Sequence, residues 1–73
     1  SGNINAKNYL GETGTVYIPV PADGKGTGKI NIALGERYVE FEAITEEAVE
    51  LKSGETVRVT DIRSETILVV EKI

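Results

Sequence analysis

KINIALGERYVEFEAI, residues 29–44, is the stretch that decides the fold class of this chain. Apolar residues alternate with polar ones on both sides of its middle, which is the two-residue period of a β-strand. The link Leu34–Arg37 between the two alternating runs is short and contains a glycine, as is typical of a tight β-hairpin. We therefore expect two consecutive strands at residues 29–34 and 38–44.

Three further runs of the strand period occur outside this hairpin, at residues 15–20, 56–60 and 66–71. Pro19 has no amide donor, so the first of these runs should lie at a sheet edge or end at the proline. The last run is apolar on both faces, which indicates a central or covered strand.

A short helical turn is expected between the third and fourth strands. Thr45 is followed by acidic residues, an arrangement typical of a helix N-cap, and a glycine at position 54 ends the segment. Three strands, a helical turn and two strands are the order found in a five-stranded, partly open Greek-key barrel of the oligonucleotide/oligosaccharide-binding (OB) type. We predict this all-β fold, with an SH3-like barrel as the alternative. One domain should cover residues 10–73, and residues 1–9 should be a tag remnant and a linker from an upstream segment.

Composition excludes several kinds of site. The 73 residues include no cysteine and no histidine, which removes disulfides, thiolate metal sites and the usual serine–histidine and cysteine–histidine nucleophile pairs. The formal net charge of −4 disfavours nucleic acid as a partner, because a surface that binds nucleic acid normally carries positive charge.

The glycine-rich stretch DGKGTGK, residues 23–29, has some features of a phosphate-binding loop. A Walker-type loop needs a glycine where Asp23 stands, a hydroxyl residue where Ile30 stands, and a helix directly afterwards. A strand pattern follows here instead, so no helix N-terminus is available to an anion. We interpret the stretch as a turn between two strands.

The densest acidic stretch consists of Glu40, Glu42, Glu46, Glu47 and Glu50. A cation site needs carboxylates that converge from a turn. The pattern favours instead a solvated strand face that runs into a capped turn. No residue has the surroundings of a catalytic, metal-binding or cofactor-binding group, so we expect a protein that is not an enzyme and has no cofactor.

Aromatic and basic residues form a candidate binding face. Tyr17 and Tyr38 are expected on the polar side of their strands, and barrel proteins that bind single strands stack bases on such aromatics beside basic residues. A nucleic-acid-binding OB domain is therefore the alternative function, and it would use Tyr17, Tyr38, Lys29, Arg37 and Arg58. The tyrosines could equally cover the flank of the barrel with their hydroxyls in water.

The order and spacing of glycines and alternating runs resemble the soluble C-terminal domain of the NfeD-like membrane proteins. The resembling segments are residues 10–16, Pro21, and residues 28–30, 34–38, 42–43, 51–59 and 66–71. The resemblance implies a five-stranded OB-type barrel that is carried behind transmembrane helices. It also implies partners among stomatin-, prohibitin- or flotillin-like scaffold proteins in membrane microdomains, and protein contacts in place of catalysis.

We therefore expect a non-catalytic protein-interaction module of a membrane-anchored protein, itself soluble and on the cytoplasmic side. The strand at residues 15–20 should offer an exposed edge for strand addition. The expected interaction surface contains Tyr17, Pro19, Lys25, Lys29, Arg37 and Tyr38. Self-association is a second use for such a surface. Membrane contact is expected only through segments outside this chain.

Overall fold

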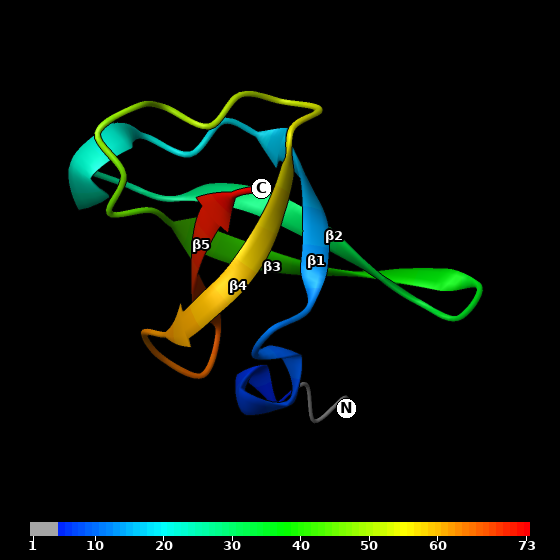
Figure 1. Cartoon of the computed structure of the whole chain (residues 1–73). Helices are drawn as coiled ribbons and strands as arrows, with labels where there is room; N and C mark the ends of the chain where they lie inside the picture. The colour runs from blue at the N-terminus through cyan, green and yellow to red at the C-terminus, as the bar shows by residue number, and fades with distance from the viewer. Residues whose placement is uncertain (1–4) are drawn as a thin grey trace.

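Five β-strands close into a barrel in the computed structural model, which describes residues 5–73 (Figure 1). The strands are β1 (Thr13–Ile18), β2 (Gly28–Leu34), β3 (Arg37–Ile44), β4 (Thr56–Ile62) and β5 (Ile67–Lys72). Two short 3-10 helices, η1 (Ala6–Tyr9) and η2 (Ala22–Gly24), are the only helices within the described range. Neighbouring strands follow the order β1-β2-β3-β5-β4, and β4 pairs with β1. This confirms the predicted all-β, five-stranded barrel.

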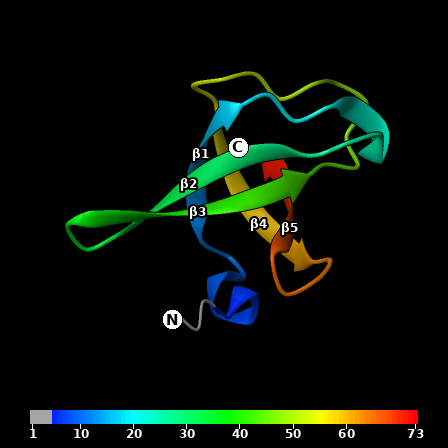
Figure 2. The ribbon, with the colours of Figure 1, turned by 180° about the vertical axis from the view of Figure 1, so that it is seen from behind.

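The β2–β3 hairpin has the predicted tight turn. Its register runs without interruption from Gly28 opposite Ala43 to Leu34 opposite Arg37. Gly35 has φ 66 and occupies the first central position of the turn, where a type II′ hairpin requires a glycine. The tip of this hairpin projects beyond the other strands (Figure 2).

Barrel closure leaves β1 without a free edge. The strand pairs antiparallel with β2 on one side and with β4 on the other. It ends at Ile18, directly before Pro19, as the missing amide donor of the proline predicted. The expectation that this strand offers an exposed edge is wrong, because its backbone groups are used on both sides.

The barrel interior is filled by side chains that alternate along the strands. The largest fully buried ones on the strands are Val16, Ile30, Ile32, Val57, Val59, Leu68 and Val70. β-Branched side chains dominate because the interior of so small a barrel is just wide enough to hold them. β5 is covered on both faces, since Val69 is buried between Leu68 and Val70, and the apolar run predicted this.

The segment between β3 and β4 is not helical, so the predicted helical turn is wrong. The Thr45 hydroxyl accepts a hydrogen bond from the Glu47 amide at 3.1 Å, which closes a local turn. The backbone carbonyls of Thr45 and Glu47 accept from the amides of Gly24 and Asp23, at 2.7 and 2.8 Å, and not from the following turn of a helix. Leu51 then pairs with Val20 through two backbone hydrogen bonds of 2.9 Å. These long-range contacts outweigh the local N-cap signal.

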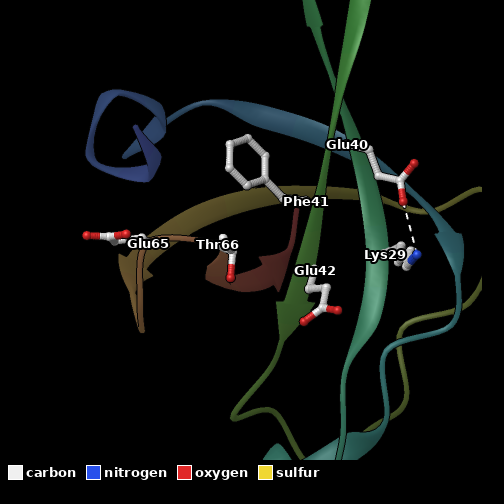
Figure 3. A pocket seen from close by; sticks show the side chains of 6 residues that line it. All are labelled: Lys29, Glu40, Phe41, Glu42, Glu65 and Thr66. Atoms are coloured by element: carbon white, nitrogen blue, oxygen red, sulfur yellow. Dashed lines mark ion pairs between the residues drawn. The ribbon is translucent and has the colours of Figure 1, made fainter. Parts of the chain in front are cut away.

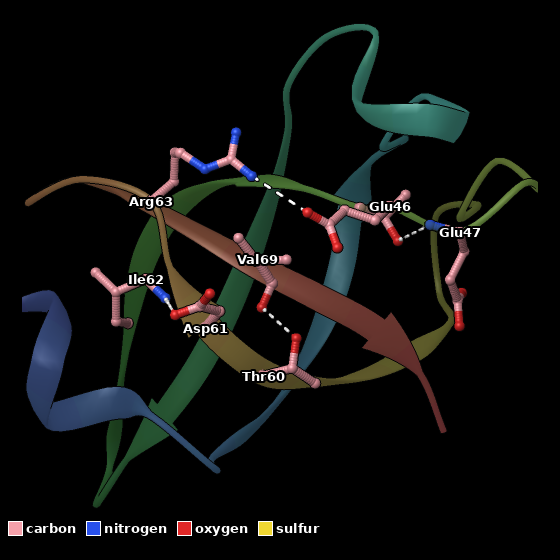
Figure 4. Close-up of polar contacts among 8 residues, drawn as sticks. Glu46, Glu47, Thr60, Asp61, Ile62, Arg63 and Val69 are labelled. Atoms are coloured by element: carbon pink, nitrogen blue, oxygen red, sulfur yellow. Dashed lines mark hydrogen bonds and ion pairs between the residues drawn. The ribbon is translucent and has the colours of Figure 1, made fainter.

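Side chains of the same segment lie beside β5. Glu46 forms an ion pair with Arg63 at 3.4 Å (Figure 4). The Glu47 carboxylate accepts from the Lys72 amide at 3.3 Å. Arg63 precedes β5 and Lys72 ends it, so the two contacts hold the segment along the outer face of this strand. This explains why Val69 is buried although it points away from the barrel interior.

Residues 5–9 pack against the barrel. The Asn5 side chain accepts from the Lys7 amide at 3.2 Å and caps η1, whose Ala6 is buried in the core. The Tyr9 ring meets the Phe41 ring edge-on, with centroids 4.8 Å apart. The origin of residues 1–9 as a tag remnant and linker stays a prediction, and Ser1 and Gly2 lie outside the described residues.

Candidate interaction surface

The outer face of β1, β2 and β3 carries a polar cluster of Tyr17, Lys29 and Glu40. Successive side chains of a strand point to opposite faces, so the outward position of Glu40 follows from the inward position of Phe41. Tyr17 lies where the β1–β2 register shifts between Val16 and Ile18, and such a bulge can redirect a side chain. Lys29 Nζ lies 3.1 Å from Glu40 Oε2.

The electrostatics of the cluster follow from these contacts. The Tyr17 hydroxyl is the main cause that lowers the pKa of Glu40, and Lys29 lowers it further. Glu40 in turn raises the pKa of Tyr17 and the pKa of Lys29. All three side chains are open to solvent, so the contacts orient the cluster more than they stabilise the fold.

We expect Tyr17→Phe to raise the pKa of Glu40 toward its ordinary value of 4.5, because the variant lacks the main hydrogen-bond donor. A carboxyl whose pKa is lowered by folding adds stability at neutral pH, which is lost as the pH falls through its folded pKa. Side-chain NMR titration of Glu40 measures the change. Tyr38→Phe is the control and should leave the pKa of Glu40 as it is. An unchanged value in Tyr17→Phe would contradict the proposed contact.

The structure brings three of the six expected surface residues to one face. Tyr38 lies two positions before Glu40 on the same face of β3, and its side chain is 72% exposed. Arg37 neighbours Tyr38 in sequence and therefore points to the opposite face of the hairpin. Pro19 follows β1 and Lys25 follows η2, so both belong to the connection between β1 and β2. The face shared by Tyr17, Lys29, Tyr38 and Glu40 is called the tyrosine face below.

The glycine-rich connection is a turn, as interpreted from the sequence. Asp23 and Gly24 have positive φ values of 59 and 67. Their amides donate to the carbonyls of Glu47 and Thr45 and are therefore not free to bind a phosphate.

A groove of about 410 Å³ lies between β3 and the chain that enters β5 (Figure 3). It is lined by Lys29, Glu40, Phe41, Glu42, Glu65 and Thr66. Sequence reasoning missed the contribution of Glu65 and Thr66. The parallel pairing of β3 with β5, which sets Glu42 opposite Ile67, could have revealed it.

The polar side chains of the described residues form no metal-binding cluster. No cluster of acidic side chains within residues 5–73 has the geometry of a metal site, and no buried side-chain polar atom there lacks a hydrogen-bond partner. Ser53 donates its hydroxyl to the Tyr17 carbonyl of β1, and the Ser64 hydroxyl accepts from the Thr66 amide in the turn before β5. No helix in the same range has the length and hydropathy to span a membrane.

The tyrosine face offers little free positive charge for binding a nucleic acid. Lys29 is already paired with Glu40, and Glu42 lies directly across from Lys29 on β3. Arg37 points to the other face of the hairpin, and Arg58 on β4 lies opposite Glu71. The structure thus unites only Tyr17, Tyr38 and Lys29 of the five residues in the nucleic-acid alternative.

We therefore expect single-stranded oligonucleotides not to bind, even at low ionic strength, because the tyrosine face lacks uncompensated positive charge. Fluorescence anisotropy with labelled oligo-dT and oligo-rU measures this. Saturable binding that weakens steeply with added salt would support the nucleic-acid alternative.

Comparison with solved structures identifies a similar barrel in an experimentally studied protein. The chain matches the solution structure of the soluble domain of the NfeD protein YuaF from Bacillus subtilis, with a TM-score of 0.77 and 25% sequence identity. The match covers 92% of this chain and 76% of that chain. No protein-family model and no curated protein matches the sequence. The structural match confirms the resemblance found in the sequence: the chain has the fold of an NfeD-like domain.

Proposed function

From this NfeD-like fold we propose that the chain is a non-catalytic protein-interaction module of a membrane-anchored protein. The observation that carries the proposal is the structural match to the YuaF domain over nearly the whole chain. The partner is a scaffold protein of the stomatin, prohibitin or flotillin type, and the pair works in membrane organisation. The anchor belongs to the full-length protein, and the barrel lies on the cytoplasmic side.

The tyrosine face has the make-up of an interaction surface. Tyrosine is enriched at protein interfaces because it buries a large rigid ring and keeps a polar end. Tyr38 is exposed next to the ordered pair of Lys29 and Glu40, so an apolar contact point lies beside a polar rim. The barrel beneath is held by a continuous set of strand pairings, which presents these side chains on a rigid support.

Binding of the purified chain to a stomatin-, prohibitin- or flotillin-like scaffold protein of the same organism tests the proposal, with pull-down and calorimetry as readouts. We expect a saturable complex, and Tyr38→Ala should weaken it by about tenfold or more if Tyr38 is an aromatic anchor. Val49→Ala is the matched control, because Val49 is 68% exposed in the segment between β3 and β4. A folded chain that neither binds the scaffold nor alters its assembly would contradict the proposal.

A further inference from the structure

We infer that the free edge of β3 binds an extended segment of the partner that carries lysine or arginine at alternate positions. The inference rests on the proposed function and adds where the partner strand lies and which chemistry selects it. The segment lies beside Arg37–Phe41, past the point where β5 begins, and adds a strand to the barrel.

The backbone of β3 has hydrogen-bonding groups that no other strand uses. β2 pairs with β3 from Arg37 to Ala43, whereas β5 pairs only with Glu42–Ile44. In an antiparallel pair every second residue directs its N–H and C=O away from the partner. The two-residue turn makes Leu34 and Arg37 a hydrogen-bonded pair, so Tyr38 and Glu40 are the residues that direct these groups outward. No turn or loop hydrogen bond recorded for residues 5–73 uses them.

The free edge has room beside it. The groove follows β3 past Glu40 and Glu42 and ends against Glu65 and Thr66 (Figure 3). The chain before β5 turns away at this point, because the amides of Arg63 and Ser64 both donate to the Ile67 carbonyl, at 3.0 and 3.2 Å. A partner strand therefore continues the line of β5 along β3. The five edge residues span about 17 Å, which is the length of an ordinary strand.

Charge selects a basic partner. Three carboxylates line the groove, and the single lysine among them is paired with Glu40. Glu40 and Glu42 point to the same face of β3, as residues two apart on a strand do. A lysine or arginine of the added strand opposite Glu40 lies next to this carboxylate and diagonally across from Glu42, and opposite charges on neighbouring strands stabilise the pairing.

A second copy of this chain is the less suitable occupant. Antiparallel pairing of two free β3 edges, each of which ends at Phe41, sets Tyr38 of one copy opposite Glu40 of the other and supplies no basic side chain to either carboxylate. The net charge of −4 also makes two copies repel each other. The edge therefore favours a different, basic chain over self-association.

Amide NMR with synthetic peptides tests the inference directly. The probe TKVKVKT should shift the amide signals of Tyr38 and Glu40 and slow their hydrogen exchange. The acidic counterpart TEVEVET should bind about tenfold more weakly or worse, because complementary charge selects partners at an interface. TKVKVKT methylated at alternate backbone amides should no longer shift the Tyr38 and Glu40 signals or slow their exchange, since it cannot donate to the free edge.

Variants of the chain separate the backbone contribution from the charge contribution. Tyr38→Pro removes the outward N–H and leaves the β2 ladder intact, whereas Tyr38→Thr keeps this donor. TKVKVKT should bind the proline variant about tenfold more weakly than the threonine variant. Because proline could disturb the strand, the double variant Glu42→Gln, Glu65→Gln gives a second measurement, of the charge contribution to TKVKVKT binding. Its control, Glu12→Gln with Glu50→Gln, removes the same charge outside the groove and should leave the affinity as it is.

The outcomes distinguish this inference from the proposed function. No perturbation at Tyr38 and Glu40, or equal binding of the basic and acidic peptides, overturns the edge inference even where the scaffold protein binds the chain. A failure of the scaffold to bind overturns the proposed function, while a basic peptide that docks on the β3 edge still supports the inference.

Discussion

Gly28→Ala is expected to lower the free energy of unfolding by about 3 kcal/mol or more, because a side chain at this position has no space. Gly28 begins β2, and an added Cβ would overlap the backbone carbonyl oxygens of Ile18 and Pro19. The backbone cannot easily retreat, since Ile18 pairs with Lys29 and Val20 is bonded to Leu51. A core of this size supplies only about 3–5 kcal/mol, so the variant should be largely unfolded.

Urea unfolding followed by circular dichroism measures the effect. Gly26→Ala is the matched control in the same connection, because its Cβ meets only the Pro21 ring, at 3.3 Å. That variant should change the free energy of unfolding by less than about 1 kcal/mol, since a side-chain ring can shift slightly. A Gly28→Ala protein that unfolds at the urea concentration of the original chain would show that β1 and β2 are not this close.

Leu68→Ala is expected to cost about 2–5 kcal/mol, because it removes a fully buried side chain from the middle of the barrel and leaves a cavity. Leu68 lies on β5, and this strand pairs with both β3 and β4. The variant therefore weakens packing between β5 and the rest of the barrel interior.

Leu34→Ala makes the same chemical change on the hairpin, where the leucine is 44% exposed. The same urea experiment should give a loss of about 0.5 kcal/mol or less for this variant, as for most surface substitutions. Equal losses for the two leucine variants would contradict the placement of Leu68 in the core.

Local patterns predicted the strands well because a strand needs only its own alternation and a compatible turn. The hairpin around Gly35 and the doubly covered β5 are both visible as sequence patterns. The prediction of a helical turn after Thr45 failed for the opposite reason. Its conformation depends on the bridge between Val20 and Leu51 and on hydrogen bonds to η2, which join residues far apart in sequence.

The pairing partners of each strand were also beyond local reasoning. Pro19 correctly marks the end of β1, but a proline does not reveal that barrel closure pairs β1 on both sides. The free edge lies instead on β3, since β5 pairs with only three of its residues. Sequence alone could not show this, because it depends on where the chain turns away before β5.

The tyrosine face was partly predictable. Alternation predicts the outward positions of Tyr17, Lys29 and Tyr38, which the structure places on one face. The pairing of Lys29 with Glu40 was not predicted, because it requires the register of β2 against β3 and the position of the side chains. Arg37 was assigned to the surface by charge alone, and the alternation it shares with Tyr38 turns it to the other face.

The central claim is that this barrel works by binding a scaffold protein of the stomatin, prohibitin or flotillin type. Calorimetric titration of the folded chain with that scaffold tests it most directly, with thermal unfolding run in parallel to verify the fold. We predict saturable binding with a stoichiometry set by the scaffold subunits, and weaker binding by Tyr38→Ala than by Val49→Ala. A folded chain that releases no binding heat and co-purifies with none of the scaffold would contradict the claim.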